Sequence, residues 1–565
     1  PQLDVFGGFV PTPADARFLR RMVRDNQFRK RNPADTVRLW SKVRAGDTVT
    51  FDKTQMGTDT IKIVGVGAVN TDTSLVIRKG VTIEGDGVTI DGGWAGVLKD
   101  GTGGRIFLVP EGLDKVTIRN LTMRNGHGRG WNDAGNRYFQ GGALCALSPV
   151  RFENCSFIHN CAADEAAHAP TMRGGGAIYA EADIEVFDCT FEDNVGGNAN
   201  NSFGGTILLN GVSAQIERIT VNRDRSDSFG GGFLYGESVP SLIIRDASFQ
   251  GVTAAARGGA LCLKLFTSVL IDRSSFVGCH AGFTWGGAVM LGDGTCGKAV
   301  FRDCQFTDCS GQCGGAVRSH ANPGIFVNCT FTGGAMNGDA WGPAIDSRGN
   351  DYCINCTFTG NMFTDNNHGS SGGFAVCRYG SSCKFLNCVG AFNYNRAATG
   401  ASGDLETGKD FYDNNFINTI CNGKAADRKT DLTPESPLFA AFETRTSVSC
   451  WGNKIALKDG VVVPSYVEDA KNQYPTKVIG IAKDGLLDGT GWQVKVNADY
   501  SHICYSSDGG TTWTDFYKSG TPDDSTLAPI TADQRGVPYK NGVPPIGAAT
   551  YADTSSKTGF LIIIR

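Results

Sequence analysis

The chain repeats one short pattern of apolar and polar positions. An apolar residue is followed by two polar residues, then a small or sulfur-containing residue, one further position and usually phenylalanine. The apolar residue that opens each copy is Ile118, Phe152, Val186, Ile216, Ile244, Ile271, Phe301, Phe326, Cys353 or Phe385. This alternation has the period of a β-strand rather than a helix. Each copy therefore predicts a short strand whose phenylalanine faces a core.

A second motif, Gly-Gly followed by a small or apolar residue, runs in step with the first. Its copies begin at Gly141, Gly175, Gly204, Gly231, Gly258, Gly286, Gly314, Gly342 (as Gly-Pro-Ala) and Gly372, about 28 residues apart. That period contains two or three strand-like segments and no helical pattern, and it is too short for a propeller blade of ~40–45 residues. We expect an all-β fold, a right-handed parallel β-helix, in which glycine supplies backbone conformations closed to other residues where the next strand starts.

Like residues should stack in ladders, because every coil of a solenoid repeats the same inward positions. The phenylalanine and the residue two before it are the first such pair. Asparagines three positions after the phenylalanine predict a further ladder at a bend, at Asn160, Asn194, Asn361 and Asn393.

Three parts are expected along the chain. Residues 1–46 read as a small N-terminal helical cap, basic because ten Lys or Arg fall between Arg17 and Arg44 among apolar residues at helical spacing. We interpret this basic run as a solvated face. Residues 47–445 form the β-helix, and residues 446–565 form a C-terminal β-rich cap.

Composition excludes several classes of protein. Glycine accounts for 76 of 565 residues without the period of collagen, and the net charge of −4 gives no cationic field for nucleic acid. No stretch of about 18 apolar residues occurs, so no membrane span is expected. The start at Pro1 without a methionine suggests a processed chain whose targeting signal has been lost.

Cysteines occupy the rung two positions before the phenylalanine, at Cys155, Cys189, Cys304, Cys329, Cys356 and Cys388. Stacked strands lie ~4.8 Å apart, which lets the last four pair as disulfides, but a ladder of buried thiols is the favoured interpretation. Cys304, Cys309 and Cys313 lack the paired spacing of a zinc site. Calcium at the acidic loops 164–165 or 404–406 is less favoured than solvation, so no cofactor is expected.

The paired signatures Gly-Gly-Ala-[Ile/Leu/Val] and Phe-x-x-Asn resemble the β-helix repeats of the polymorphic outer-membrane-protein type. They are also similar to the coils of secreted bacterial β-helix proteins and carbohydrate-active enzymes such as polysaccharide lyases. Segments 81–92 and 116–123 resemble the opening coils of that group, and segments 436–439, 533–536 and 546–548 the closing part of its surface-anchored members. The resemblance implies a protein that is secreted or held at a bacterial cell surface. It says little about activity, since one solenoid hosts many functions.

Alternation within the strand after Gly-Gly predicts a column of side chains that point away from the core, into solvent. Its members are Tyr179, Glu181, Tyr235, Glu237, Lys264, Arg318, His320, Asp346, Arg348 and Arg378. Like charges on adjacent rungs repel, and a bound polyanion would offset that repulsion. We therefore expect an anionic polysaccharide as the partner.

An extracellular polysaccharide lyase is the leading hypothesis. Cleavage of a uronic-acid polymer by β-elimination needs a cation to neutralise the carboxylate, a base for the C5 proton and an acid for the leaving oxygen. Arg318, Arg348 and Lys264 are the expected neutralising cations, and His320 is the expected base. Tyr179 or Tyr235 is expected to act as base or as leaving-group acid.

Further residues are expected to contact the polymer without taking part in the chemistry. Four belong to the column: Glu181, Glu237, Asp346 and Arg378. The others lie on or near loops that would wall a groove beside it: His127, Trp131, Tyr138, Trp285 and Trp341. The aromatic members are as well explained by packing as by stacking on sugar rings.

Two alternatives remain open. A glycoside hydrolase on the same fold needs two carboxylates ~5–9.5 Å apart, whereas Glu181 and Glu237 lie two coils apart, about 10 Å. A non-catalytic surface adhesin or glycan-binding solenoid needs no such pair. The Asp-box pattern at Ser506, Asp508, Gly510 and Thr512 occurs once, which indicates a turn with its own hydrogen bonds rather than a propeller.

Overall fold

The computed structural model describes much of the chain between residues 44 and 549. The described residues are 44–51, 59–63, 74–96, 102–128, 140–162, 174–197, 204–227, 229–282, 285–294, 296–336, 342–364, 375–378, 383–396, 405–407, 415–421, 439–450, 453–467, 474, 476–479, 481, 487 and 489–549. Residues 1–43 of the expected N-terminal cap lie outside them, as do Trp131, Tyr138 and Trp341, and Arg378 is described only as part of a strand.

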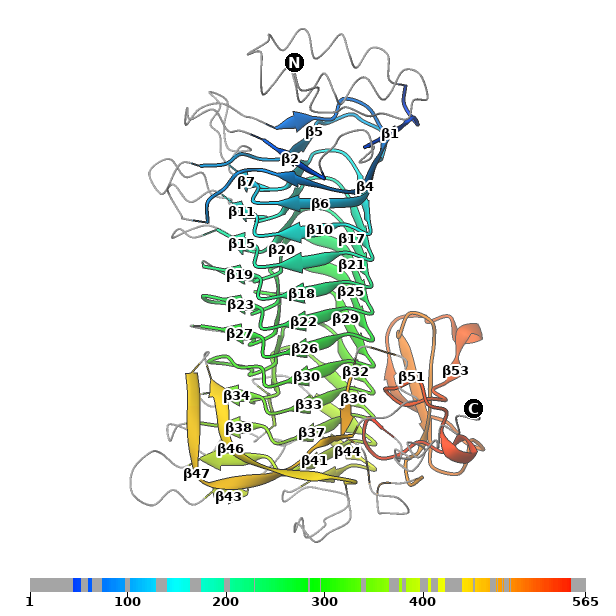
Figure 1. Ribbon diagram of the computed structural model, residues 1–565. Coiled ribbons are helices and arrows are strands. Elements are labelled where there is room, and N and C mark those ends of the chain that lie inside the picture. The colour runs from blue at the N-terminus through cyan, green and yellow to red at the C-terminus, as the bar shows by residue number, and fades with distance from the viewer. Residues whose placement is uncertain are drawn as a thin grey trace, which may run out of the picture. The chain divides into compact units, whose positions relative to one another are not determined.

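The described part is almost entirely β-structure, and its parallel stacked strands form a β-solenoid (Figure 1). The expected fold class is confirmed. The chain packs as two compact units, the first comprising residues 1–269 and 279–296 and the second residues 270–278 and 297–565. The boundaries of the three expected parts stay a prediction.

Three parallel sheets make up the first unit. The longest sheet contains β1 (Thr48–Thr50), β2 (Thr60–Lys62), β4 (Thr82–Asp91), β6 (Val116–Arg124), β9 (Val150–Glu153), β10 (Ser156–Ile158), β13 (Ile184–Phe187), β14 (Thr190–Glu192), β17 (Ala214–Glu217), β18 (Thr220–Asn222), β21 (Val239–Arg245) and β22 (Ser248–Gln250). The strands after each Gly-Gly form a second sheet: β3 (Leu75–Val76), β5 (Phe107–Val109), β8 (Leu144–Ala146), β12 (Ile178–Ala180), β16 (Ile207–Asn210), β20 (Leu234–Glu237), β24 (Leu261–Leu263) and β28 (Val289–Leu291). The third sheet has two-residue strands: β7 (His127–Gly128), β11 (Cys161–Ala162), β15 (Val195–Gly196), β19 (Arg225–Ser226), β23 (Thr253–Ala254) and β27 (His280–Ala281).

The second unit continues the same kind of coil. Strand β25 (Phe266–Asp272) runs across the boundary, and the longest sheet here contains β26 (Ser275–Val277), β29 (Lys298–Arg302), β30 (Gln305–Thr307), β32 (Gly324–Val327), β33 (Thr330–Thr332), β36 (Asp351–Ile354), β37 (Thr357–Thr359), β40 (Cys383–Leu386), β41 (Val389–Ala391), β44 (Asn415–Ile417) and β45 (Ile420–Cys421). The other solenoid strands are β31 (Val317–Ser319), β35 (Ile345–Ser347), β39 (Val376–Arg378), β34 (Ala335–Met336), β38 (Met362–Phe363) and β42 (Tyr394–Arg396). Strand β43 (Leu405–Thr407) pairs with β42 in antiparallel orientation.

Antiparallel strands follow the solenoid in the second unit. Strands β46 (Phe442–Cys450) and β47 (Asn453–Pro464) form a hairpin, and β48 (Tyr466–Val467) pairs with β49 (Val478–Ile479). A four-stranded sheet has the order β52 (Thr514–Lys518), β51 (His502–Ser506), β50 (Gln493–Val496), β53 (Ala528–Pro529). Two 3-10 turns, η3 (Asp524–Thr526) and η4 (Lys540–Gly542), lie near the end.

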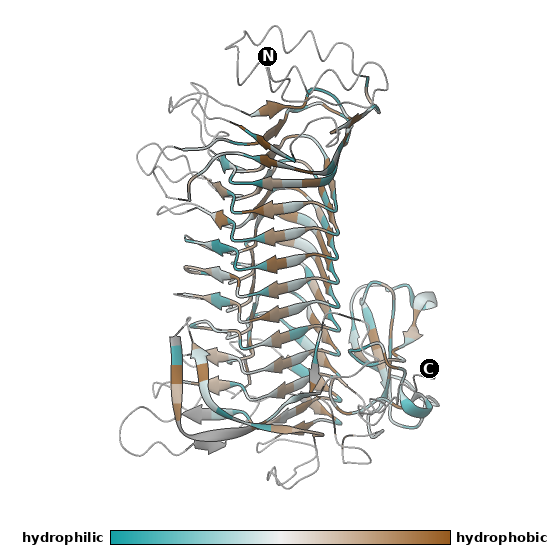
Figure 2. Cartoon of the chain, viewed as in Figure 1, coloured by the Kyte–Doolittle hydropathy of each residue, from teal (hydrophilic) through white to brown (hydrophobic). Residues whose placement is uncertain are grey.

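Register stacks like residues in both units, as the repeat predicted. Phe306 pairs with Phe331 and Phe331 with Phe358, with ring centroids 4.7 and 4.9 Å apart and nearly parallel planes. Figure 2 shows apolar residues recurring along the stacked strands. The core of each unit is therefore a column of repeated side chains inside the coils.

The asparagine ladder is also present. Asn160 Nδ2 donates to Asn194 Oδ1 (3.0 Å), and Asn361 Nδ2 donates to Asn393 Oδ1 (2.9 Å). In the coil after Asn194 the position is filled by the buried Asp224, which accepts from Asn194 and from Thr206 Oγ1. Burial raises the pKa of Asp224 to about 7.

Left-handed backbone occurs where the Gly-Gly motif predicted it. Gly175 has φ +69°, and a Cβ there would lie 2.3 Å from the carbonyl oxygen of Ile178. A further left-handed position, which the sequence analysis missed, follows the first half of the long strand in each coil. It is held mostly by Asn or Asp, with φ of 51° at Asn154 and 52° at Asn355.

Candidate functional site

The two tyrosines of the expected column do not face solvent, whereas the Lys264 side chain is 43% exposed. Cys145, Tyr179, Leu208, Tyr235, Cys262 and Met290 form an apolar cluster on that face of the second sheet, separate from the solenoid interior. Tyr179 and Tyr235 are each only 2% exposed. The alternation correctly predicts that these side chains point away from the interior of the solenoid. It gives no information on whether other residues cover that face of the sheet, and here both faces are buried.

The two tyrosines are engaged with the carboxylates two positions later. Tyr179 donates its hydroxyl to Glu181 (2.6 Å), and Tyr235 donates to Glu237 (2.9 Å). Lys264 forms an ion pair with Glu237 at 2.9 Å. Burial, reinforced by the adjacent carboxylates, raises the pKa of both phenols well above the usual value. A phenol held protonated in this way is a poor general base.

Two of the expected groove residues are also placed differently. His127 is fully buried, with Nδ1 2.8 Å from the carbonyl oxygen of Thr102 and its ring beside Trp94. The guanidinium of Arg257 lies 4.1 Å from the ring centroid of Trp285 and 4.7 Å from that of Phe229. One ring face of Trp285 is therefore already occupied by Arg257, and the burial of His127 leaves it without access to a polymer.

Charged residues gather on strands β31 and β35, and directly after them, in the second unit. We use the name Arg318 cluster for Arg318, His320, Asp346 and Arg348. Arg318 Nη1 lies 3.5 Å from Asp346 Oδ2, and Arg348 Nε lies 3.2 Å from Asp346 Oδ1. Arg318 pairs in register with Asp346, which puts them on adjacent rungs. All four residues belong to the column expected from the sequence, and the structure brings them together.

Burial differs within the Arg318 cluster. Asp346 is completely buried and Arg318 is 4% exposed, whereas His320 is half-buried and the Arg348 side chain is 14% exposed. Burial raises the pKa of Asp346, and the two guanidinium groups oppose that shift. Two cations therefore share one carboxylate, and the more accessible members are His320 and Arg348.

The tautomer of His320 follows from its contact with Arg318. Arg318 Nε lies 3.3 Å from His320 Nε2, and a guanidinium nitrogen can only donate. Nε2 is therefore the acceptor, and a neutral imidazole carries its proton on Nδ1. The ring is held in a form that can take up a proton at Nε2 once Arg318 engages another acceptor.

Behind this cluster the inward side chains of the same strands are also polar. Ser319 Oγ donates to Asp351 Oδ1 (2.9 Å), and Ser347 stabilises the same carboxyl group. Burial raises the pKa of Asp351 to about 7, with the charge of Asp346 adding to the shift. Sequence reasoning missed Asp351, whose only signal is an acidic residue at an inward strand position.

The C-terminal segment covers the outer face of the second unit's long sheet. Val494, Ile503 and Phe516 pack against an apolar strip made by Val300, Ile325, Val327, Ile354 and Leu386. In the first unit several of these outward positions carry Arg or Glu, as at Arg151 and Glu217. The change from charged to apolar residues at these outward positions is the feature of the sequence that indicates a covering segment.

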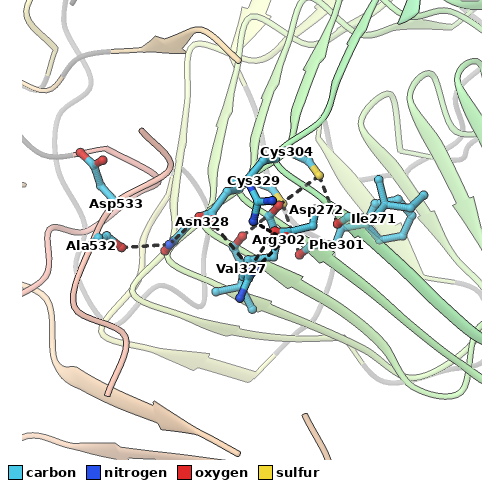
Figure 3. A network of polar contacts seen from close by, with 12 residues as sticks. Ile271, Asp272, Phe301, Arg302, Cys304, Val327, Asn328, Cys329, Ala532 and Asp533 are labelled. Atoms are coloured by element: carbon cyan, nitrogen blue, oxygen red, sulfur yellow. Dashed lines mark hydrogen bonds and ion pairs between the residues drawn. The ribbon is translucent and has the colours of Figure 1, made fainter. Parts of the chain in front are cut away.

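A polar network lies under this cover (Figure 3). Arg302 contacts the buried Asp272 through two nitrogens, and Asn328 Nδ2 donates both to Asp303 Oδ1 (2.9 Å) and to the carbonyl oxygen of Ala532 (3.1 Å). Burial raises the pKa of Asp303 to about 8, although Asn328 and Arg302 both favour the ionised form.

His502 belongs to the four-stranded sheet of the second unit. Its Nε2 lies 2.8 Å from Asp515 Oδ1 and its Nδ1 2.5 Å from Asp524 Oδ1. Hydrogen bonds to both carboxylates raise its pKa although burial opposes them. The Asp-box turn makes its hydrogen bonds within the turn, as expected. Asp508 accepts from the backbone N–H groups of Thr511 and Thr512.

Every cysteine whose side chain the structure describes is free, and all of them are buried, which confirms the thiol ladder. Within the described ranges no group of three or more His, Cys, Asp or Glu side chains is placed to hold a metal ion. No helix in the described part of the chain is long and apolar enough to cross a membrane.

Comparison with known proteins adds no relative: no protein family, no curated protein and no solved structure matches this chain.

Proposed function

We propose that the chain binds an anionic polysaccharide of the uronic-acid class, such as a glycosaminoglycan or pectin, and cleaves it by β-elimination at the Arg318 cluster. The observation that carries the proposal is the sharing of Asp346 by Arg318 and Arg348, which leaves positive charge beside the imidazole of His320, whose Nε2 accepts from Arg318. Because such polymers are extracellular, the proposal places the protein outside the cell or on its surface.

Arg348 is the first contact for the uronate carboxylate, since it is the more exposed of the two arginines. Bidentate binding of a carboxylate by a guanidinium is strong and directional. Neutralising that carboxylate stabilises the charge that develops when the C5 proton leaves. Lys264 lies in the other unit and is already paired with Glu237, so the step does not use it.

His320 supplies the proton transfer. When Arg318 turns to the substrate carboxylate, His320 Nε2 accepts the C5 proton, the C5–H electron pair forms the C4–C5 double bond, and the C4–O bond breaks. The imidazolium then gives its proton to the departing oxygen, which restores the neutral ring. This assignment replaces Tyr179 and Tyr235, whose hydroxyl protons are held by Glu181 and Glu237.

The test is to incubate the protein with chondroitin sulfate, heparin, polygalacturonate and alginate while following the ultraviolet absorbance of a new C4–C5 double bond. We expect one polymer to give unsaturated product. His320→Gln should lower the rate by roughly 10²–10⁴-fold, the usual share of a positioned acid–base group. Arg348→Ala should lower it by roughly 10²–10³-fold, the usual share of one group that stabilises developing charge. Arg223→Ala, which removes an exposed arginine of the first unit, is the charge-matched control.

Three results would contradict the proposal. The first is the absence of unsaturated product from every polymer. The second is release of reducing ends without a double bond, which would indicate hydrolysis. The third is tight binding without cleavage that Arg348→Ala abolishes, which would indicate a glycan-binding solenoid without catalysis.

A further inference from the structure

The left-handed asparagines of the second unit form an amide ladder that holds the C-terminal segment. Each Nδ2 group donates one proton along the ladder, from Asn355 to Asn328 (3.1 Å), from Asn387 to Asn355 (3.0 Å) and from Asn418 to Asn387 (2.8 Å). The other proton goes to the covering segment, to Tyr539 Oη and to the carbonyl oxygens of Trp492 and Thr490. Asn387 also accepts from the backbone N–H of Trp492. The amide side chains of the ladder therefore bind a polypeptide segment, chiefly through its main-chain groups.

The first unit has a similar ladder of asparagine amides, and no segment among the described residues covers it. Asn154 Nδ2 donates to Asn120 Oδ1 (2.7 Å), and Asn120 Nδ2 donates to Glu84 Oε1 (2.7 Å). Asn120 and Asn154 have φ of 54° and 51°, the same left-handed conformation as the ladder of the second unit. The second proton of each amide meets no partner within the described ranges.

These amides line a hollow of about 410 Å³. Its walls are Glu84, Asp86, Gly87, Asn120, Leu121, Thr122, Asn154 and Ser156. The hollow lies where the pairing of β4 with β6 shifts between Glu84 and Val88, because β4 has two more residues there than β6. Bulges of this kind are common beside functional sites.

Charge in the hollow is negative. Glu84 is paired with Arg119 at 2.5 Å, but the exposed carboxylate of Asp86 meets no described partner. A polyanion would be repelled here, so the hollow is not an extension of the proposed lyase site. The amide protons that meet no described acceptor can donate to the main-chain carbonyl oxygens of a peptide. The exposed carboxylate beside them can pair with a cationic side chain of that peptide.

We propose that this hollow binds an extended polypeptide segment, with main-chain carbonyl oxygens on Asn120 and Asn154 and a lysine or arginine opposite Asp86. The inference is independent of the lyase activity. It rests on the ladder of the second unit, where the same side chains in the same conformation take main-chain carbonyl groups.

The experiment measures binding of an oligolysine peptide to the full chain by calorimetry, with oligoglutamate and maltohexaose as the other probes. We expect oligolysine alone to bind. Asn154→Gly and Asp86→Asn should each weaken binding about three- to tenfold, the loss of a hydrogen bond or an ion pair. Both substitutions suit left-handed backbone, so the fold should survive, as circular dichroism will show.

The matched control is Asp246→Asn, which removes a carboxylate at the same position of a later coil, with φ 53°, outside the hollow. It should leave the affinity for oligolysine unchanged. Equal binding of oligoglutamate, an equal loss from Asp246→Asn, or competition by maltohexaose would overturn the proposal. The last result would identify a sugar site instead.

Discussion

At the residue scale, the bends of this solenoid depend on left-handed backbone at residues that are not glycine. Such a conformation costs an ordinary residue about 1–2 kcal/mol, and least for Asn and Asp, whose side chains bond locally. Asn328, Asn355 and Asn387 each recover that cost through hydrogen bonds along the ladder. The identity of a bend residue is therefore set jointly by its φ angle and by what its side chain can reach.

Asp303 begins this ladder and should make stability depend on pH. Its pKa of about 8 in the folded state lies above the ordinary value of 3.8, so the folded state holds a proton that the unfolded chain releases. Stability should be greatest below pH 3.8 as far as this group is concerned, and fall by up to ~1.4 kcal/mol per pH unit between the two values.

Asp303→Asn removes this titration while keeping an acceptor for Asn328 and a side chain suited to φ 56°. We expect the unfolding free energy of the variant to decline less between pH 5 and pH 8 than that of the parent, as measured by denaturant titration. Parallel pH profiles for the two proteins would show that Asp303 is ionised in the folded state.

At the element scale, the same coil supports two kinds of outer face. In the first unit the outward side chains of the long sheet form ion pairs such as Arg151 with Glu185 at 2.9 Å. In the second unit several of them are apolar, such as Ile325 and Leu386, and pack against strands β50, β51 and β52. Because inward positions repeat while outward ones do not, the coil persists and only its covering changes.

The amide ladder should hold that cover in place. Asn387→Gly preserves the left-handed backbone at φ 52° but removes four hydrogen bonds: with Asn355, with Asn418 and two with Trp492. We expect a loss of about 2–4 kcal/mol at buried amides and faster amide hydrogen exchange in β50. Asn154→Gly is the control, since its ladder carries no described cover. A similar change in β50 for both variants would contradict a specific role for Asn387.

At the scale of the whole molecule, a solenoid behaves as a nearly one-dimensional stack in which each coil contacts mainly its neighbours. Contacts such as those of Phe331 with Phe306 and Phe358 join adjacent coils alone. A defect in one coil should therefore stay local.

Phe331→Ala tests this, because the side chain is completely buried. The cavity should cost about 3–5 kcal/mol and speed hydrogen exchange in β30, β33 and β37. Exchange in β9 to β18 of the first unit should stay as in the parent. Uniform acceleration across the described strands would instead show that the chain unfolds as one cooperative body.

Much of the fold was predictable because the same pattern of residues recurs in successive coils. The period of about 28 residues, the phenylalanine ladder, the glycine at the strand entry and the Asn160 ladder all follow from short-range pattern. The candidate site was predictable only in part. Register alone put Arg318, His320, Asp346 and Arg348 together, but the expectation that Tyr179 and Tyr235 face solvent was wrong.

The sequence by itself determined the coil, its register and the direction in which each strand residue points, because these depend on spacing within one repeat. Only the tertiary structure decided which outward faces are covered, which arginine of the Arg318 cluster is buried, and that an asparagine ladder grips the segment around Trp492. The last of these outcomes depends on contacts between residues far apart in the chain, since Asn387 and Trp492 are 105 positions apart. No local period encodes such contacts.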